Sequence, residues 1–331
     1  MQRYTFYIYY ANYFVYLCTK LRQKTKPMKK TLLIESHSKL FLRNSSLIIS
    51  KETEKKKEIK ERAIPLSDID ALILESQQIT ITTGLLNALL TRKVAIVICD
   101  SKTMPKGVVN PLVGNVLQTE RQNRQLAASA PLKKQMWQFI IKCKIINQAN
   151  VLSHHSKSKA GCLHKWGQDV KSGDNTMMEA RAAQYYWSHL FDKHIKHFKR
   201  SRDGEPPNNV LNYGYSVIRL IVIKNIITTG LLPSIGLHHS NKYNPFCLAD
   251  DLMEPYRPYI DHAICQMLEK GMDLSVLNQD IKGKLFGVTW QKVKINGRNT
   301  SLSNAITISV YSFLKSIKEG KMHLLYPEIE L

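Results

Sequence analysis

Acidic residues are scarce in this chain. Its 331 residues include 26 Asp and Glu against 48 Lys and Arg, which gives a formal net charge of +22 at pH 7. An excess of this size is typical of nucleic-acid-binding proteins, because lysine and arginine displace the counterions condensed on phosphate. A membrane surface and a merely soluble basic protein are the alternatives. The hydrophobic content of 44% excludes a disordered chain.

Closely spaced cysteine pairs are also missing. The six cysteines never occur at Cys-x-x-Cys spacing; they are Cys18, Cys99, Cys143, Cys162, Cys247 and Cys265. This spacing argues against a zinc ribbon and against a disulfide framework, and it favours a reducing cytoplasm. A loose cluster of His154, His155, Cys162 and His164 offers a single thiol. A zinc site in that cluster is therefore only a minor alternative.

Several catalytic and targeting signatures are absent as well. There is no internal repeat, no glycine-rich phosphate loop and no Gly-x-Ser-x-Gly nucleophile elbow, so Ser/His/Asp catalysis has no anchor. The apolar run from Thr5 to Cys18 is too short to span a membrane. Because Met28-Lys-Lys-Thr-Leu-Leu-Ile reads as a natural beginning, we expect residues 1–27 to be an upstream extension that is disordered or not native.

The apolar pattern predicts an α+β protein with a small N-terminal β-rich domain followed by a larger all-α C-terminal catalytic domain. Short apolar or alternating runs between Thr31 and Cys99 predict strands around one short helix, and these make up a domain over residues 28–103. The mixed charges of residues 51–62 predict a solvated connection. Glycine and proline in residues 104–115 predict a linker to the domain at 116–331.

Helical spacing dominates after this linker. We predict a short strand over residues 290–295 and helices over 118–128, 132–151, 177–191, 210–229, 262–270 and 305–319. The apolar helix at 210–229 ends at Gly230, and Arg219 and Lys224 interrupt it. We therefore expect a buried core helix and not a membrane span.

The stretch from Gly236 to Asp261 holds the densest set of candidate ligands. His238 and His239 precede a polar loop, and Asp250, Asp251 and Glu254 follow it. Spacings of three and four residues place these carboxylates on one face of a helix. Carboxylates with an imidazole suit magnesium or manganese better than structural zinc. The alternatives are a simple turn at the histidines and acidic residues that complement a helix dipole.

Glu179 opens an amphipathic helix and has two possible roles. Thr176-x-x-Glu179 matches a capping box, in which the glutamate reaches back to the N–H of the capping residue. Local pattern favours this capping role over a ligand role.

Four motifs in order resemble the Cas1 family, the CRISPR-associated endonuclease of spacer acquisition, and most of all its type II branch. They are Glu179-Ala-Arg-Ala-Ala-x-Tyr-Tyr-Trp, Leu211-Asn-Tyr-Gly-Tyr, Gly236-x-His-His and Leu248-x-x-Asp-Leu-Met-Glu-Pro-Tyr-Arg-Pro. The resemblance covers residue 28 to the C-terminus and implies the same two-domain fold. It also implies a metal held by a glutamate, a histidine and an acidic residue, which fall on Glu179, His239 and Glu254. His239 is preferred to His238 because the family histidine lies three residues after the glycine. Pro255 predicts a kink just after Glu254.

The resemblance further implies the reaction and its partners. The 3′-hydroxyl of a short captured duplex would attack a phosphodiester at the repeat edge of the CRISPR array, with Mg²⁺ or Mn²⁺ as cofactor. The implied partners are double-stranded DNA, a second copy of the chain in a homodimer, the small protein Cas2 and the type II effector nuclease, all in the cytoplasm without a membrane. Two alternatives are a stand-alone metal-dependent nuclease on branched DNA or RNA, and a non-catalytic basic DNA scaffold. The roles of His238, Asp250 and Asp251 stay open.

Overall fold

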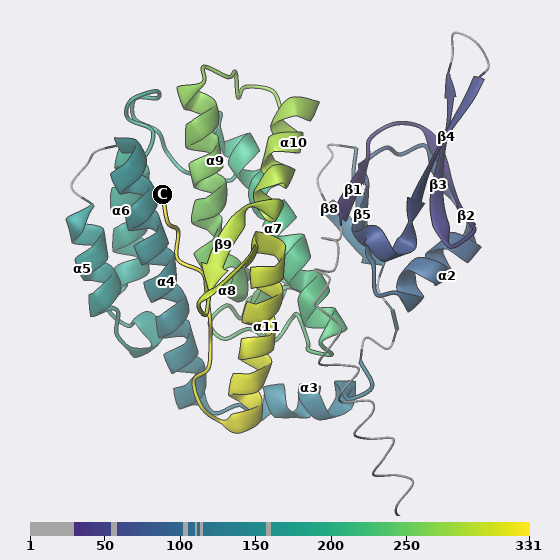
Figure 1. Ribbon diagram of the computed structural model, residues 1–331. Helices are drawn as coiled ribbons and strands as arrows, with labels where there is room; N and C mark the ends of the chain where they lie inside the picture. The colour runs from purple at the N-terminus through teal and green to yellow at the C-terminus, as the bar shows by residue number, and fades with distance from the viewer. Residues whose placement is uncertain (1–29, 54–57, 102–104, 110, 113–114, 157–159) are drawn as a thin grey trace, which may run out of the picture.

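Strands form the N-terminal part of the molecule and helices form most of the rest (Figure 1). The computed structural model describes residues 30–53, 58–101, 105–109, 111–112, 115–156 and 160–331. This arrangement confirms the predicted α+β class. The expected extension at residues 1–27 lies outside the described residues.

One N-terminal sheet has the strand order β4-β3-β2-β6. Its strands are β2 (Ser38–Arg43), β3 (Ser46–Thr53), β4 (Glu58–Pro65) and β6 (Ile79–Ile81). Strands β3 and β4 pair antiparallel from Ser46↔Pro65 to Thr53↔Glu58. The prediction that residues 51–62 are a solvated connection is therefore wrong. The far end of this hairpin is exposed at residues 59–63, so its residues lack the apolar alternation by which a half-buried strand is recognised.

The second N-terminal sheet has the order β1-β5-β7-β8. It contains β1 (Lys30–Ile34), β5 (Ile69–Leu74), β7 (Ala95–Cys99) and β8 (Pro105–Val109). Buried Leu40, Leu72 and Ile96 from both sheets join Leu85 and Leu89 of helix α2 (Thr83–Thr91) in one core. Burial of these apolar side chains holds the sheets together.

Strand β8 lies inside the predicted linker at residues 104–115 and corrects that prediction. It pairs antiparallel with β7, and Val108 faces Val97 in the register. Proline and glycine give such a strand a weak local signal, and pairing with β7 decides its conformation. The division of the chain into separate domains at this point stays a prediction.

The helical part is organised around two long buried helices, α4 (Ala130–Ser156) and α7 (Asn208–Thr228). Around them lie α3 (Gln118–Leu126), α5 (Gly161–Asp169), α6 (Met178–His189), α8 (Cys247–Met253), the 3-10 turn η3 (Glu254–Tyr256), α9 (Arg257–Glu269), α10 (Gln279–Gly287) and α11 (Leu302–Glu319). A hairpin of β9 (Lys292–Ile295) and β10 (Arg298–Ser301) adds the predicted strand, so this part is not purely α.

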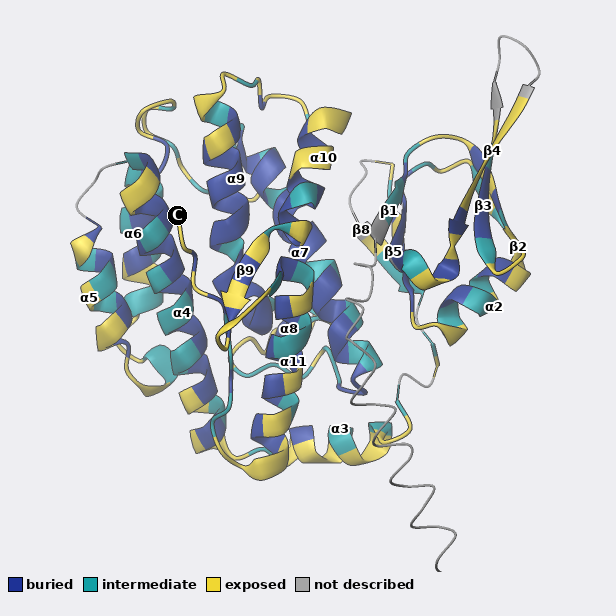
Figure 2. Ribbon diagram, viewed as in Figure 1, coloured by how far each residue is buried: buried dark blue, intermediate teal, exposed yellow. Residues whose placement is uncertain are grey.

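Helix α7 is the one described helix that is long and apolar enough to cross a membrane. Its most apolar window is 67% buried inside the protein, and Figure 2 shows α7 mostly in the colour of buried residues. This burial agrees with the predicted core helix. At its close contact with α9, a Cβ on Gly214 would lie 2.4 Å from Ile260 Cγ2, which explains the glycine in the second motif.

Asn147 on α4 clips the segment around residues 327–329 to the turn η3. Its Nδ2 donates to the carbonyl oxygens of Pro255 at 2.9 Å and Pro327 at 3.3 Å, and its Oδ1 accepts from the N–H of Ile329 at 2.9 Å. The side chain is 1% exposed. Because the donors and acceptors are buried, each bond that is lost costs the desolvation of its partner. The clip therefore fixes the backbone next to Glu254.

A buried ion pair joins the N-terminal sheet to the helices. Lys282 Nζ on α10 lies 2.8 Å from Glu75 Oε2, just after β5, with side-chain exposures of 8% and 3%. The hydroxyl of Tyr213 on α7 donates to Glu75 Oε1 at 2.9 Å. Lys282 and Tyr213 from the helices thus neutralise and hydrogen-bond the buried carboxylate of Glu75, which follows the N-terminal strand β5.

Candidate active site

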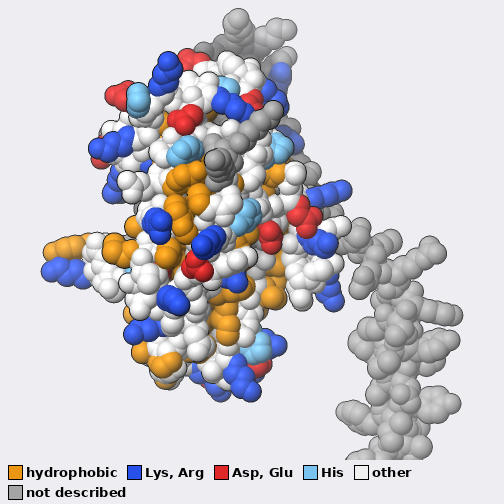
Figure 3. Space-filling model, turned by 90° about the vertical axis from the view of Figure 1, so that its left-hand side faces the viewer, with side chains coloured by type: hydrophobic (Ala, Val, Ile, Leu, Met, Phe, Trp, Pro, Cys, Tyr) orange, Lys and Arg blue, Asp and Glu red, His pale blue; other side chains and the backbone are white. Residues whose placement is uncertain are grey.

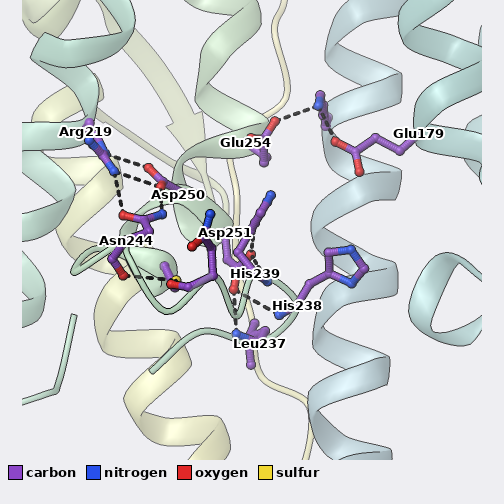
Figure 4. Close-up of polar contacts among 12 residues, drawn as sticks. Glu179, Arg219, Leu237, His238, His239, Asn244, Asp250, Asp251 and Glu254 are labelled. Atoms are coloured by element: carbon purple, nitrogen blue, oxygen red, sulfur yellow. Dashed lines mark hydrogen bonds and ion pairs between the residues drawn. The ribbon is translucent and has the colours of Figure 1, made fainter. Parts of the chain in front are cut away.

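Four charged side chains from four elements meet at one point, and Figure 4 shows two of them, Glu179 and Glu254, pointing toward each other. Lys144 Nζ on α4 lies 2.6 Å from Glu179 Oε1 on α6 and 2.6 Å from Glu254 Oε2 on η3. Arg257 Nε at the start of α9 donates to Glu254 Oε1 at 2.9 Å. Glu179 and Glu254, which are 75 positions apart in the sequence, thus converge on one positive charge.

Burial sets the electrostatics of this cluster. The Glu254 side chain is 5% exposed and the Lys144 side chain 11%. Burial alone would raise the pKa of Glu254, but Arg257 and Lys144 outweigh it and lower that pKa to about 2. Burial lowers the pKa of Lys144, and the carboxylates of Glu254 and Glu179 more than reverse this, so the net shift is upward. Glu254 and Lys144 are therefore both charged near neutral pH.

Glu254 Oε2 combines a close cation with an unused hydrogen-bonding capacity. It lies 2.6 Å from Lys144 Nζ, yet it accepts no hydrogen bond of acceptable geometry among the described residues. The short distance makes the two groups an ion pair, since electrostatic attraction needs no particular angle. The angle at Oε2 does not suit a hydrogen bond, so this buried oxygen keeps a lone pair that could bind another group.

Asp251 organises the loop that carries the histidines. Its carboxylate accepts from the backbone N–H groups of Leu237 at 2.5 Å, His238 at 3.1 Å and His239 at 3.2 Å. It also lies 2.6 Å from Nδ1 of His239. Because a carboxylate only accepts, Nδ1 carries the proton and Nε2 presents the lone pair of the neutral ring. This bond raises the pKa of His239, and burial opposes it.

The sharp loop depends on Gly236. A Cβ at this position would lie 2.4 Å from the carbonyl oxygen of His239 and 2.7 Å from Asp251 Oδ2. Only glycine lets the backbone approach the carboxylate this closely. The predicted Gly-x-His-His motif therefore has a steric reason.

His238 and Asp250 point to other partners. The His238 ring stacks on Trp137 of α4 with centroids 4.4 Å apart and an interplanar angle of 1°. Asp250 accepts from Arg219 Nε at 2.6 Å and Arg219 Nη2 at 2.8 Å, and from Asn244 Nδ2 at 2.6 Å. Figure 4 shows Asp250, Asn244 and Arg219 together at the left, away from Glu179 at the right.

The prediction of one carboxylate face is therefore wrong. Asp250, Asp251 and Glu254 bind three different sets of partners. The helix α8 ends at Met253 and a 3-10 turn containing Pro255 follows, so Glu254 leaves the regular helical spacing. This break confirms the kink predicted from the proline.

The capping role that the local pattern favours for Glu179, and that the family resemblance sets aside, is not formed. The carboxylate of Asp174 accepts from the N–H groups of Met178 at 2.9 Å and Glu179 at 3.0 Å, and so caps the start of α6. The Glu179 side chain is left to bond Lys144. Asp174 lies four residues before Met178, the first residue of α6. This spacing differs from that of a capping box, so the sequence pattern does not identify Asp174 as the capping residue.

Asp261 is a further buried centre that sequence reasoning did not assign. Tyr215 on α7 and Tyr186 on α6 donate their hydroxyls to it at 2.5 Å and 3.0 Å. Burial raises the pKa of Asp261 to about 6 although both hydroxyls lower it. The tyrosines of the first two motifs thus hold α6 and α7 against α9, which positions Glu179 relative to Glu254.

Among the described residues, no group of three or more His, Cys, Asp and Glu side chains is placed to hold a metal ion. The predicted residues Glu179 and Glu254 share the ammonium of Lys144, and His239 bonds Asp251 through Nδ1. The zinc alternative is not formed either. His155 bonds Glu269 and His262 at 2.7 Å each, and burial lowers the pKa of His262 to about 4.

Known proteins resemble this chain over most of its length. The family model described as CRISPR associated protein Cas1 matches residues 32–275. The CRISPR-associated endonuclease Cas1 of Neisseria meningitidis serogroup C (strain 8013) is 34% identical over 302 residues, which is 91% of this chain and 96% of that relative.

Solved structures share the fold. A casposase bound to integration product has a TM-score of 0.73 at 22% identity, covering 89% of this chain and 92% of that chain. A Cas6-RT-Cas1–Cas2 complex has a TM-score of 0.70 at 19% identity, covering 93% of this chain and 37% of that one. At these identities the likeness establishes the fold alone.

Proposed function

This chain belongs to the Cas1 family of CRISPR-associated proteins, and from this we propose that it is a metal-dependent DNA endonuclease and integrase that inserts short duplexes into a CRISPR array. One observation carries the proposal. Two carboxylates from distant segments converge on one cation, and a buried aspartate orients the ring of His239. The name of the Neisseria relative supports the endonuclease activity.

The residues fit a hard divalent cation such as Mg²⁺ or Mn²⁺. Glu179 and Glu254 already hold a positive charge between them, and Glu254 Oε2 is buried without a hydrogen bond. Oxygen ligands with one imidazole suit these metals. We propose that Glu179, Glu254 and Nε2 of His239 hold the ion. A bound ion would polarise the phosphodiester and stabilise charge on its oxygens.

The chain's own residues position the reaction. Asp251 fixes the tautomer and direction of the His239 ring, a role that commonly accompanies histidine ligands. Arg257 keeps the carboxylate of Glu254 ionised and in place. The tyrosines bound to Asp261 and the clip of Asn147 hold the elements that carry the two glutamates. Catalysis then rests on positioning and on electrostatic stabilisation.

The proposed reaction is a transesterification. The 3′-oxygen of the incoming duplex forms a bond to phosphorus, the bond from phosphorus to the 3′-oxygen of the array strand breaks, and the proton of the attacking hydroxyl ends on the leaving oxygen. One P–O bond replaces another, so no covalent enzyme intermediate is needed. With water as the attacking group, the same site would hydrolyse DNA.

The partners follow from charge and from family membership. The net charge of +22 suits contact with the phosphates of double-stranded DNA. On the face in Figure 3, lysine and arginine side chains are spread between acidic and apolar ones rather than gathered in one patch. We propose a homodimer that works with Cas2. One of the solved structures that share the fold is a complex of a Cas6-RT-Cas1 protein with Cas2. The type II branch, its effector nuclease as a partner and a cytoplasmic location belong to the same proposal.

The direct test is integration of a labelled duplex into a supercoiled plasmid that carries the array. The reaction contains purified Cas2 and Mn²⁺ or Mg²⁺, and it compares the natural chain with His239→Ala. We expect joined product to fall at least about 100-fold in the variant, because a lost ligand weakens both metal binding and transition-state stabilisation. DNA binding should persist.

His238→Ala is the matched control, because it removes only the ring stacked on Trp137. It should retain integration within about tenfold of the natural chain. Equal product from the natural chain and His239→Ala would remove His239 from the site. Cleavage of branched DNA or RNA without any joining would favour the stand-alone nuclease, and binding without either reaction would favour the scaffold.

Replacing Gly236 by alanine should displace His239 without touching a proposed ligand. The new Cβ would clash with the His239 carbonyl and with Asp251. We expect a loss of about 1–3 kcal/mol in unfolding free energy and a fall of about 10–100-fold in integration. Urea unfolding and the plasmid assay measure the two effects. Gly283→Ala at an exposed position of α10, where a Cβ meets nothing within 4 Å, is the control and should leave integration unchanged. Full integration by Gly236→Ala would contradict the steric account.

A further inference from the structure

Lys144 stands where the two proposed carboxylate ligands converge. Its ammonium lies 2.6 Å from one oxygen of Glu179 and 2.6 Å from one oxygen of Glu254. The residue is 8% exposed and projects from a long buried helix. A surface lysine that happens to reach a carboxylate would not be buried with two of them. This ammonium is a built-in part of the cluster.

The cluster is electrically balanced without any metal. Glu179 and Glu254 supply two negative charges, and Lys144 and Arg257 supply two positive charges. A divalent ion added to this set would leave an excess of two positive charges in a largely buried place. Like charges at such short range repel strongly when water is excluded.

The geometry also excludes both cations from the same position. Carboxylate oxygens approach Mg²⁺ at about 2.0–2.1 Å, whereas the ammonium already lies 2.6 Å from the inner oxygens of both glutamates. A metal held by those two oxygens would overlap the ammonium. Lysine carries its charge on a flexible four-carbon stem, which allows the ammonium to move aside while helix α4 stays in place.

We propose that the Lys144 ammonium is the resident counter-ion of the metal-free site, and that a divalent metal binds by displacing it. The inference rests on the proposed function, because it takes Glu179 and Glu254 as metal ligands. Lys144 is then a positioning residue: it keeps two like charges together before the metal arrives, and it weakens the apparent affinity for the metal.

The test measures metal binding and not the activity of the loaded protein. Mn²⁺ is titrated into the full chain by isothermal calorimetry, comparing the natural protein with Lys144→Met, which keeps an unbranched side chain that is one atom shorter and removes its charge. We expect the Kd for Mn²⁺ to fall at least about tenfold, which corresponds to about 1.4 kcal/mol. Lys144→Arg keeps the charge and should bind Mn²⁺ no more tightly than the natural chain.

Matched variants separate this proposal from the proposed function. Lys142→Met alters a lysine on the same helix that is only half-buried, and it should leave the Kd unchanged. Glu254→Gln should abolish binding. If the natural chain binds Mn²⁺ and Glu254→Gln does not, the metal site stands, and an unchanged or weaker Kd in Lys144→Met overturns the role of Lys144 alone. Absence of Mn²⁺ binding by the natural chain and by Lys144→Met would overturn both.

Thermal unfolding provides a second measurement with its own expected sign. Without metal, Lys144→Met should melt at a lower temperature than the natural chain, because two buried carboxylates lose a shared partner. Saturating Mn²⁺ should raise its melting temperature by more than it raises that of the natural chain. Where the methionine variant does not fold, Lys144→Gln takes its place with the same expected tightening. An equal rise in both proteins would contradict displacement.

Discussion

Glu254→Gln should abolish strand joining while the protein stays folded. Glutamine has nearly the same shape, and its amide oxygen can still accept from Arg257 Nε, which lies 2.9 Å from Glu254 Oε1. Glutamine lacks the negative charge of Glu254, which Arg257 and Lys144 stabilise by lowering the pKa of its carboxyl group. Because the side chain at this position is only 5% exposed, water cannot take over the electrostatic role of the lost carboxylate. We expect integration to fall at least about 10²–10³-fold, as when one preorganised electrostatic contact of an active site is lost.

The plasmid integration assay measures this loss, and far-UV circular dichroism establishes that the variant is folded. Asp250→Asn is the control in the same motif, because Asp250 bonds Arg219 and Asn244 and not Lys144. It should change integration by less than about tenfold. If Glu254→Gln joins DNA at more than a tenth of the natural rate, Glu254 is not a ligand in the sense proposed above.

Lys282→Met should produce the largest loss of stability. It removes the cation 2.8 Å from Glu75 Oε2 and leaves that buried carboxylate with only the hydroxyl of Tyr213. Breaking a buried pair by removing one partner costs about 3–5 kcal/mol, because the remaining charge is uncompensated. Urea unfolding measures the loss as a lower transition midpoint. The N-terminal strands should unfold first, since the pair joins them to α7 and α10.

Two further variants isolate the charge. Glu75→Gln combined with Lys282→Met should recover most of the lost stability, because neither partner is then charged. Lys284→Met breaks an exposed pair with Asp280 on the same helix, where the two side chains are 39% and 64% exposed. That change should cost less than about 1 kcal/mol. A cost of similar size in Lys282→Met would show that the buried pair does not hold the junction.

Elements with a strong local signal could be predicted from the sequence. Helix α7 covers Asn208–Thr228 where 210–229 was predicted, and the chain leaves it through Gly230 at a φ of 78°. Strand β9 ends at residue 295, as predicted, and the Asn296-Gly297 turn that follows has φ of 49° and 73°, as a tight hairpin requires. Here apolar period and turn chemistry agree, so local reasoning suffices.

The contacts within the candidate site could not be predicted in this way. Lys144 is one of four lysines in α4, and nothing in its own neighbourhood in the sequence points to Glu179 or Glu254. The four donors to Asp251 come from residues 12 to 14 positions earlier, through a loop whose path depends on Gly236. Residues 59–63 of β4 are all exposed, so they lack the apolar alternation that would predict the hairpin of β3 and β4. In each case a partner distant in the chain decides the outcome.

The clip made by Asn147 has a consequence for the newly synthesised protein. Its amide joins the backbone beside Glu254 to residues 327 and 329, which the ribosome adds more than 70 positions later. When Glu179, His239 and Glu254 have been synthesised, the nascent chain still lacks residues 327 and 329, whose contacts with Asn147 help to fix the backbone beside Glu254. We therefore expect the proposed active site to be complete only late in translation, and polypeptides that end before residue 327 should neither cut nor join DNA in the plasmid assay.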